Sequence, residues 1–166
     1  MRPLSQLTRP VSLPTRYNLQ VRPPFQFFDH TGFHHVINSE KVFGTHNHQE
    51  LIDGTEAIAH SLKRAGYRVF ALTDNVHEIV AHLKWRHQFW NVFEGAVVSA
   101  EIGLMKPNPA IFRHAAKTFD VAAGETVFLD DVQANVDGAR SIGMEARVFT
   151  MPSRCEEDLR ALGLVF

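Results

Sequence analysis

Two short segments of this sequence carry residue types that suit chemistry on phosphate. Lys106 lies in the segment Met105–Pro109, and Asp130 and Asp131 directly follow the apolar run Val127–Leu129. Adjacent carboxylates at the end of a buried strand are costly unless positive charge lies beside them. A hard cation such as Mg²⁺ would supply that charge, because it takes oxygen ligands. A nearby lysine would add a second positive charge for an anionic substrate, so the two segments together predict a phosphate site.

Each of these signals also has a plainer interpretation. A loop lysine such as Lys106 is often simply solvated, although the two prolines that follow it would stiffen the loop. Asp130 and Asp131 could cap the next helix. Thr73 and Asp74 end a run rich in β-formers, where a hydroxyl and free backbone N–H groups would bind phosphate, but they could also serve as an N-cap.

The elements that must position these residues alternate between strands and helices. Helices are expected over 54–65 with Asp53 as cap, over 76–86, 109–119 and 134–142, and from a capping box of Ser153 and Glu156 to about Leu162. Strands are expected over 67–72, 95–98, 125–129 and 145–149. Apolar strands that alternate with helices predict an α/β fold with a mainly parallel sheet covered on both faces. Ligands bind beyond the carboxyl ends of such strands, where Thr73 and Asp130 are expected.

Composition limits the classes of partner. The chain has 166 residues, which suits one domain, and its net charge of −1 with a pI near 6.8 argues against nucleic-acid binding. The sequence has no apolar run long enough to span a membrane. Cys155 is the only cysteine, so an internal disulfide is excluded and a reducing, cytoplasmic location is expected.

The first 28 residues differ from the remainder. They hold five of the eight prolines and four arginines but no acidic residue, which predicts an irregular or disordered arm before a core domain over residues 29–166. An organelle-targeting segment and a remnant foreign to the domain are the alternatives.

In order along the chain, three motifs resemble those of the haloacid dehalogenase-like hydrolases. They are Thr73-Asp74-Asn75, the segment that begins Lys106-Pro-Asn-Pro, and the segment Phe128-Leu-Asp-Asp-Val-Gln-Ala-Asn135. The resemblance covers about residues 50–150 and is strongest to the branch of the α-D-glucose-1-phosphate phosphatases. It implies a Rossmann-like, three-layer α/β/α core and Mg²⁺-dependent hydrolysis of a small phosphorylated substrate through an aspartyl-phosphate.

The same resemblance implies roles for single residues. Thr73 and the Asp74 amide would bind the phosphoryl oxygens, and Lys106 would pair with both the nucleophile and the phosphate. Asp130 and Asp131 would hold Mg²⁺ directly or through water. Asn135 would support these ligands.

The resemblance implies a nucleophile at the end of the first strand, for which Asp29, after Phe25–Phe28, is the counterpart. It would also be a metal ligand. Thr31 takes the place at which many family members have a second aspartate as acid and base. The interval between Asp29 and Thr73 is too short for a substantial cap domain, so the protein is expected to be capless or to have lost a piece of the usual domain.

Several functions stay open at this stage. The first is a Mg²⁺-dependent phosphatase for a small phosphate ester, with a sugar phosphate as one option, and the second is a catalytically inactive or truncated domain that keeps the fold. A receiver domain is disfavoured because its acidic pair comes first in the chain, and dehalogenation is disfavoured by the paired carboxylates. A loop explains the five histidines between His30 and His48 better than a zinc site does. A homodimer is also an option, because a weak first strand would leave an edge exposed.

Overall fold

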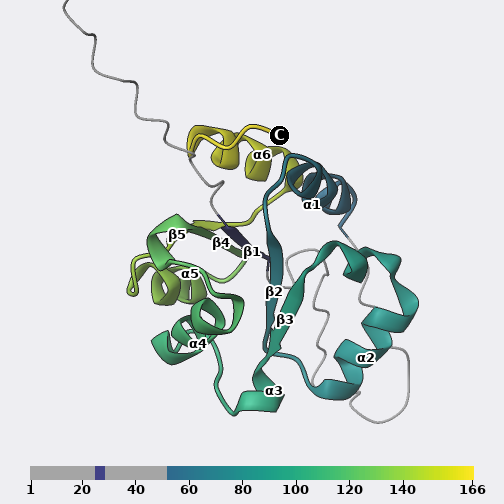
Figure 1. Ribbon diagram of the computed structural model, residues 1–166, viewed down its shortest axis with the longest axis vertical. Helices are drawn as coiled ribbons and strands as arrows, with labels where there is room; N and C mark the ends of the chain where they lie inside the picture. Colours follow the sequence, from purple (N-terminus) through teal and green to yellow (C-terminus); the bar gives the residue numbers. More distant parts are fainter. Residues whose placement is uncertain (1–24, 29–51) are drawn as a thin grey trace, which may run out of the picture.

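A computed structural model describes residues 25–28 and 52–166, and its centre is a parallel sheet (Figure 1). The described residues form five strands in the order β3-β2-β1-β4-β5, with every neighbouring pair parallel. β1 therefore lies between β2 and β4. The strands are β1 (Phe25–Phe28), β2 (Val69–Thr73), β3 (Gly95–Val98), β4 (Thr126–Asp130) and β5 (Glu145–Val148).

The two strands that flank β1 are buried along their whole length. β2 reads Val-Phe-Ala-Leu-Thr and β4 reads Thr-Val-Phe-Leu-Asp, and all five residues of each are buried. Such continuous apolar runs need cover on both faces, because successive side chains point to opposite sides of a strand.

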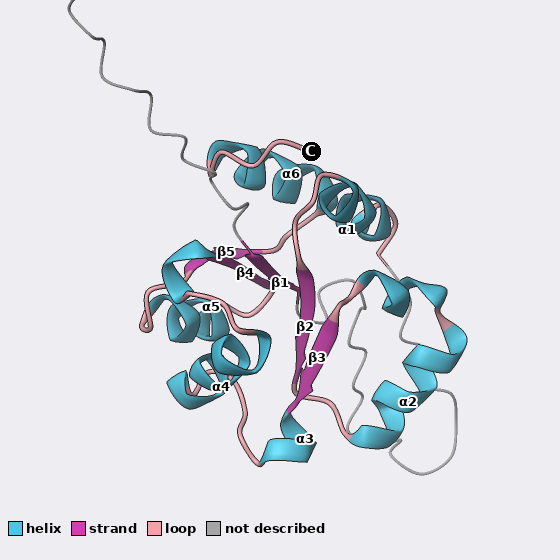
Figure 2. Ribbon diagram, viewed as in Figure 1, coloured by secondary structure: helices cyan, strands magenta, loops and turns pink. Residues whose placement is uncertain are grey.

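One face of the sheet is covered by α4 (Pro109–Phe119) and α5 (Gln133–Arg140). The other face is covered by α1 (Thr55–Arg64) and α6 (Pro152–Ala161), together with α2 (His77–Arg86) and the 3-10 helix η2 (Gln88–Val92) (Figure 2). Two shorter elements, α3 (Ser99–Ile102) and the 3-10 helix η3 (Ala123–Glu125), join β3 to α4 and α4 to β4.

The alternation of β2 shows how the layers form. Phe70 and Leu72 belong to the buried cluster of α4 and α5, whereas Val69 packs with α1 and α6, and Ala71 packs with α2 and η2. The predicted three-layer α/β/α fold with a parallel sheet is thereby confirmed.

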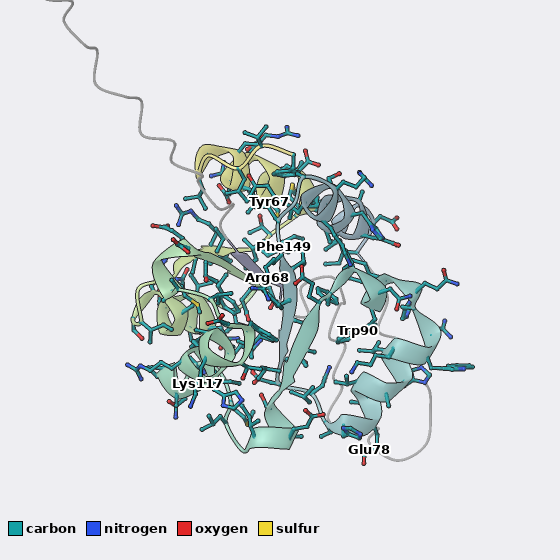
Figure 3. All side chains as sticks on the ribbon, in the orientation of Figure 1. Tyr67, Arg68, Glu78, Trp90, Lys117 and Phe149 are labelled. Atoms are coloured by element: carbon teal, nitrogen blue, oxygen red, sulfur yellow. The ribbon has the colours of Figure 1, made fainter. Side chains whose placement is uncertain are left out.

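The end of the chain is tied to the start of the second strand. Figure 3 places Tyr67 next to α6, and its hydroxyl accepts a hydrogen bond from the backbone N–H of Val165 at 3.0 Å. Leu164 and Leu159 pack in the same cluster as Tyr67. The last residues thus complete one face of the core.

Two predicted helix caps are wrong. The N-cap of α1 is Gly54 at φ 96°, rather than Asp53, and its α-carbon lies so close to Pro152 that an added Cβ would be 3.2 Å from the proline Cβ. The capping box of Ser153 is also wrong, because α6 begins earlier, at Pro152, with Met151 as N-cap. Proline suits the first helical position, since it lacks the N–H that would be unsatisfied there.

β1 extends the described core to Phe25. The predicted division at residue 28 falls at the end of this strand, and the remaining residues of the predicted arm, 1–24, lie outside the described residues. Residues 29–51, where a cap would be inserted, lie outside them too. In the described part of the chain, no helix has the length and hydropathy needed to cross a bilayer.

Candidate functional site

The predicted site residues that lie in the described part of the chain meet at the carboxyl edge of the sheet. Thr73 is the last residue of β2 and Asp130 is the last residue of β4, on either side of β1. Lys106 reaches the same edge from the loop between α3 and α4. Residues far apart in the sequence are therefore brought together where a parallel sheet binds ligands.

Lys106 and Asp130 form a buried ion pair at this edge. The Lys106 Nζ lies 2.9 Å from the Asp130 Oδ2, with the two side chains 1% and 0% exposed. Lys106 Nζ also lies 3.4 Å from the Leu72 carbonyl oxygen. A lysine loses much hydration when it is buried, so its exclusion from water requires compensating partners of this kind. The interpretation of Lys106 as a solvated loop residue is therefore wrong.

The Asp130 carboxylate is held from two further directions. Asn135 Nδ2, on α5, lies 3.0 and 3.1 Å from its two oxygens, and the Val132 backbone N–H donates to Oδ1 at 2.8 Å. Asp130 thus fixes the lysine on one side and the start of α5 on the other. Asp131, the next residue, is exposed to solvent.

The Asp74 side chain connects the end of β2 to residues 103–108, the loop that carries Lys106 and that we call the lysine loop. Its Oδ1 accepts hydrogen bonds from the Lys106 backbone N–H at 3.1 Å and from the Ser99 hydroxyl. Its Oδ2 lies 4.0 Å from Lys106 Nζ. The Asp74 side chain therefore positions Lys106, a role additional to the one predicted for its backbone amide.

Thr73 is almost fully buried, at 1% exposure, and its hydroxyl accepts a hydrogen bond from the Asn75 backbone N–H at 3.1 Å. This short turn leads into α2, whose N-cap is Val76 and has no side-chain cap. The N-cap interpretation of Thr73 and Asp74 is therefore wrong, while the phosphate role predicted for Thr73 stays a prediction.

Ser99 is a site residue that the sequence did not reveal. It is 4% exposed, and its hydroxyl lies within hydrogen-bonding distance of the Thr73 carbonyl oxygen, at 3.0 Å, and of the Asp74 carboxylate. The one sequence feature that could have indicated Ser99 is its position directly after β3. That position points to the site only when β3 is known to pair with β2.

Gly138 is a second site residue that the sequence did not reveal. At this position α5 approaches the lysine loop too closely for any side chain. A Cβ at Gly138 would lie 2.3 Å from the Pro107 carbonyl oxygen and 2.8 Å from Phe112 Cε2. The absence of a side chain at this one position of α5 therefore sets where the peptide after Lys106 lies.

Part of the predicted metal site lies in the described residues. Asp130 and Asp131 are there, whereas Asp29, the predicted nucleophile and third ligand, lies outside them. Residues 25–28 and 52–166 alone contain no group of three metal-ligating side chains. Two carboxylates at one strand end are nevertheless the hard oxygen donors that Mg²⁺ takes, so the donor chemistry fits this ion. The exposed Asp131 leaves its carboxylate accessible to it.

The single cysteine does not offer an alternative nucleophile. Cys155 lies in α6, in the cluster beneath α1, and is 3% exposed. Burial, reinforced by the nearby Asp158 and Glu156, raises the pKa of its thiol to about 12. The thiol therefore stays protonated and unreactive near neutral pH.

The sequence is similar to that of a fungal phosphatase over part of its length. The sesquiterpene phosphatase astK of Aspergillus oryzae is 33% identical over 88 residues, which are 53% of this chain and 45% of that protein. The chain spans less than half the length of the first relatives that it matches.

The fold is also found in solved structures. An uncharacterized protein from Corynebacterium glutamicum superposes with a TM-score of 0.62 at 20% identity, covering 87% of this chain and 98% of that one. An enzyme of the haloacid dehalogenase family from Bacteroides thetaiotaomicron was solved with magnesium and inorganic phosphate. It superposes with a TM-score of 0.52 at 21% identity, covering 57% of this chain and 50% of that one. At these identities the likeness shows a shared fold.

A family model settles the membership that the motifs and the sheet edge indicate. The model of the haloacid dehalogenase-like hydrolases matches residues 18–143, a span that includes Asp29, Thr73, Lys106 and both carboxylates of the pair at 130–131. The chain therefore belongs to the haloacid dehalogenase-like hydrolases.

Proposed function

We propose that this chain is a Mg²⁺-dependent phosphatase that hydrolyses a small phosphate ester through an aspartyl-phosphate on Asp29. The observation that carries the proposal is the buried Lys106–Asp130 pair, 2.9 Å apart, with the exposed Asp131 beside it. A buried lysine held at a ligand-binding edge provides a fixed positive charge for an anion that reaches that edge.

Each residue has a defined task in this reaction. Asp29 attacks phosphorus and breaks its bond to the ester oxygen, and the alcohol leaves with a proton from water. Water then hydrolyses the aspartyl-phosphate, which releases phosphate and restores Asp29, so one difficult displacement is divided into two easier steps. Lys106 lowers the repulsion between the carboxylate and the phosphate, both of which are negative. Asp74 and Ser99 are positioning residues, because they contact Lys106 or the backbone of Thr73.

Asp131, with Asp29, would be the direct holder of Mg²⁺. The Asp130 oxygens already accept hydrogen bonds from Asn135 and Val132 and pair with Lys106, which makes Asp130 a support for the lysine and a more distant neighbour of the ion. Bound Mg²⁺ supplies charge neutralisation for the phosphoryl oxygens and a template for their orientation.

The finer identity of the substrate is also proposed. The resemblance to the glucose-1-phosphate phosphatase branch makes a sugar phosphate one candidate, and the similar Aspergillus protein, a sesquiterpene phosphatase, makes the phosphate of an apolar alcohol another. The magnesium and phosphate bound to the Bacteroides structure support the choice of ion. A cytoplasmic location and a homodimer stay predictions, but the reason given for the homodimer is wrong, because β1 pairs with β2 and β4 and leaves no edge of its own exposed.

The test is release of phosphate from p-nitrophenyl phosphate and from a panel of small phosphate esters, with and without Mg²⁺. The wild type should be active only with the ion, and Asp29→Asn should lower kcat by at least about 10³-fold, as expected for loss of a nucleophile. Asp131→Asn should weaken Mg²⁺ binding, measured by calorimetry independently of activity. Glu157→Gln, an exposed change on α6, is the control.

An inactive wild type that unfolds cooperatively would favour the catalytically silent alternative. Equal activity of Asp29→Asn and wild type would place the nucleophile elsewhere. Unchanged Mg²⁺ binding by Asp131→Asn would show that Asp131 is not a Mg²⁺ ligand. The phosphatase proposal would then be judged by the activity assay alone.

A further inference from the structure

Several exposed apolar residues adjoin the site residues in the sequence. In residues 52–166, three of the large hydrophobic side chains that are exposed adjoin the site in the chain: Val76 at 48%, Met105 at 61% and Val132 at 49% exposure. Val76 follows the turn of Thr73, Asp74 and Asn75, while Met105 directly precedes Lys106. Val132 directly follows Asp131. We call these three side chains the apolar rim.

The three loops that carry the apolar rim are tied to one another. Lys106 donates its backbone N–H to Asp74 at 3.1 Å, and its Nζ lies 2.9 Å from Asp130. Asp130 in turn accepts the Val132 backbone N–H at 2.8 Å. The three rim residues therefore lie in segments that meet at Lys106.

Two members of the rim occupy positions where an apolar residue is unfavourable. Val76 is the N-cap of α2 and Val132 is the N-cap of α5, and neither helix has a side-chain cap. Ser, Thr, Asp and Asn are strongly preferred there, because their oxygens accept N–H groups of the first turn. α4 follows that rule, since Asn108 accepts from the Ala110 N–H at 2.9 Å.

We propose that the apolar rim contacts the organic group of the substrate, which is therefore an alkyl or aryl phosphate monoester rather than a sugar phosphate. This rests on the phosphatase activity proposed above. The phosphate would reach Lys106 while a hydrocarbon group, which gains free energy by leaving water, lies against Val76, Met105 and Val132. A sugar would gain little there, since its hydroxyls would find no hydrogen-bonding side chain among the three.

The test compares kcat/KM for octyl phosphate, below its micelle concentration, with kcat/KM for glucose 1-phosphate. The variants are Val76→Thr and Val132→Thr, which preserve shape, and Met105→Gln, which preserves length. Each should lower kcat/KM for octyl phosphate about three- to tenfold and change that for glucose 1-phosphate by less than about twofold. Val165→Thr, which is 81% exposed at the end of the chain, should change neither.

A second readout separates substrate contact from a structural role. Thr at either N-cap supplies the missing acceptor, so Val76→Thr and Val132→Thr should unfold at the same temperature as wild type or at a higher one. Loss of stability in step with activity would overturn the proposal. Sedimentation should give the same oligomeric state for all variants, because a shift would mean that a second copy covers the rim.

The wild-type comparison separates this proposal from the one on which it rests. Preference for glucose 1-phosphate, or equal losses on both substrates in the rim variants, would overturn the rim alone and leave the phosphatase intact. Absence of phosphate release from either ester and from the panel above would overturn both.

Discussion

Lys106 contacts both acidic groups that reach the carboxyl edge from β2 and β4. It pairs with Asp130 at 2.9 Å and lies 4.0 Å from Asp74, and the Lys106 and Asp130 side chains are almost fully buried. A buried pair of this kind adds little stability over apolar residues, but loss of one partner takes the nearest opposite charge away from the other. The phosphatase proposed above would account for this pair, because its reaction needs a positive charge in a fixed position.

This asymmetry gives a prediction for stability. Lys106→Met and Asp130→Asn should each lower the free energy of unfolding by about 3–5 kcal/mol, because each leaves its partner charged and buried. The double variant should lose less than the sum of the two, with a coupling of at least about 1 kcal/mol in urea unfolding. Glu157→Gln, which breaks the exposed 3.2 Å pair with Arg154, should change stability by at most about 0.5 kcal/mol. Additive losses would mean that the two charges do not depend on each other.

At the scale of elements, α5 packs directly against the lysine loop. Gly138 faces the Pro107 carbonyl oxygen and the Phe112 ring so closely that any Cβ must displace one of them. By helix propensity alone, alanine at an interior glycine would stabilise α5 by about 1 kcal/mol. We expect the close packing at Gly138 to make alanine destabilising instead.

Gly138→Ala should therefore destabilise the protein by about 1–3 kcal/mol, since overpacking forces the backbone or rings to move. It should also lower phosphatase activity, because Pro107 is bonded directly to Lys106. Gly124→Ala is the matched control, as a Cβ there meets nothing within 4 Å. Thermal unfolding and initial rates measure the two effects, and a more stable Gly138→Ala would show that α5 and the loop can separate.

The sequence predicted an element well where the residues that begin and end it lie within a few positions of each other. α4 runs over Pro109–Phe119 and β3 over Gly95–Val98, as expected from the sequence. The elements that were missed, α3 and the two 3-10 helices, are short and have no hydrophobic period. The hydrogen bond from Ser99 to Asp74 could not be predicted, because it joins the start of α3 to the turn after β2, which only the strand order brings together.

The same distinction applies to the site. Thr73, Lys106 and Asp130 could be assigned because each ends or precedes a recognisable element. Their burial, and the difference between the fully buried Asp130 and the exposed Asp131, depend on packing over the whole sheet. The sequence alone gives adjacent aspartates no such division of roles.

At the scale of the molecule, β1 joins two halves of the sheet. β2 and β3 lie on one side of it and β4 and β5 on the other, so its backbone hydrogen bonds hold the halves together. An edge strand could be lost with smaller consequences, because only one neighbour pairs with it.

Deletion analysis tests this arrangement and the predicted arm together. A chain that starts at residue 25 should unfold cooperatively in urea with a midpoint near that of the full chain, if residues 1–24 are an arm. A chain that starts at residue 29 should lose the cooperative transition, since the sheet lacks its middle strand. Circular dichroism follows both transitions. Cooperative unfolding of the shorter chain would show that the halves associate without β1.

The central place of β1 also has a consequence for the order of assembly. Phe27 pairs with Phe70 on one side and with Phe128 on the other, so β1 pairs with β4, from which β2 and β3 separate it in the chain. Pairing between such distant segments is slow, because a long loop must close before any contact forms. During synthesis the β4 side of β1 has no partner until Asp130 has left the ribosome. Unpaired strand edges and exposed apolar surface favour aggregation, so we expect the nascent chain to be prone to it during that interval.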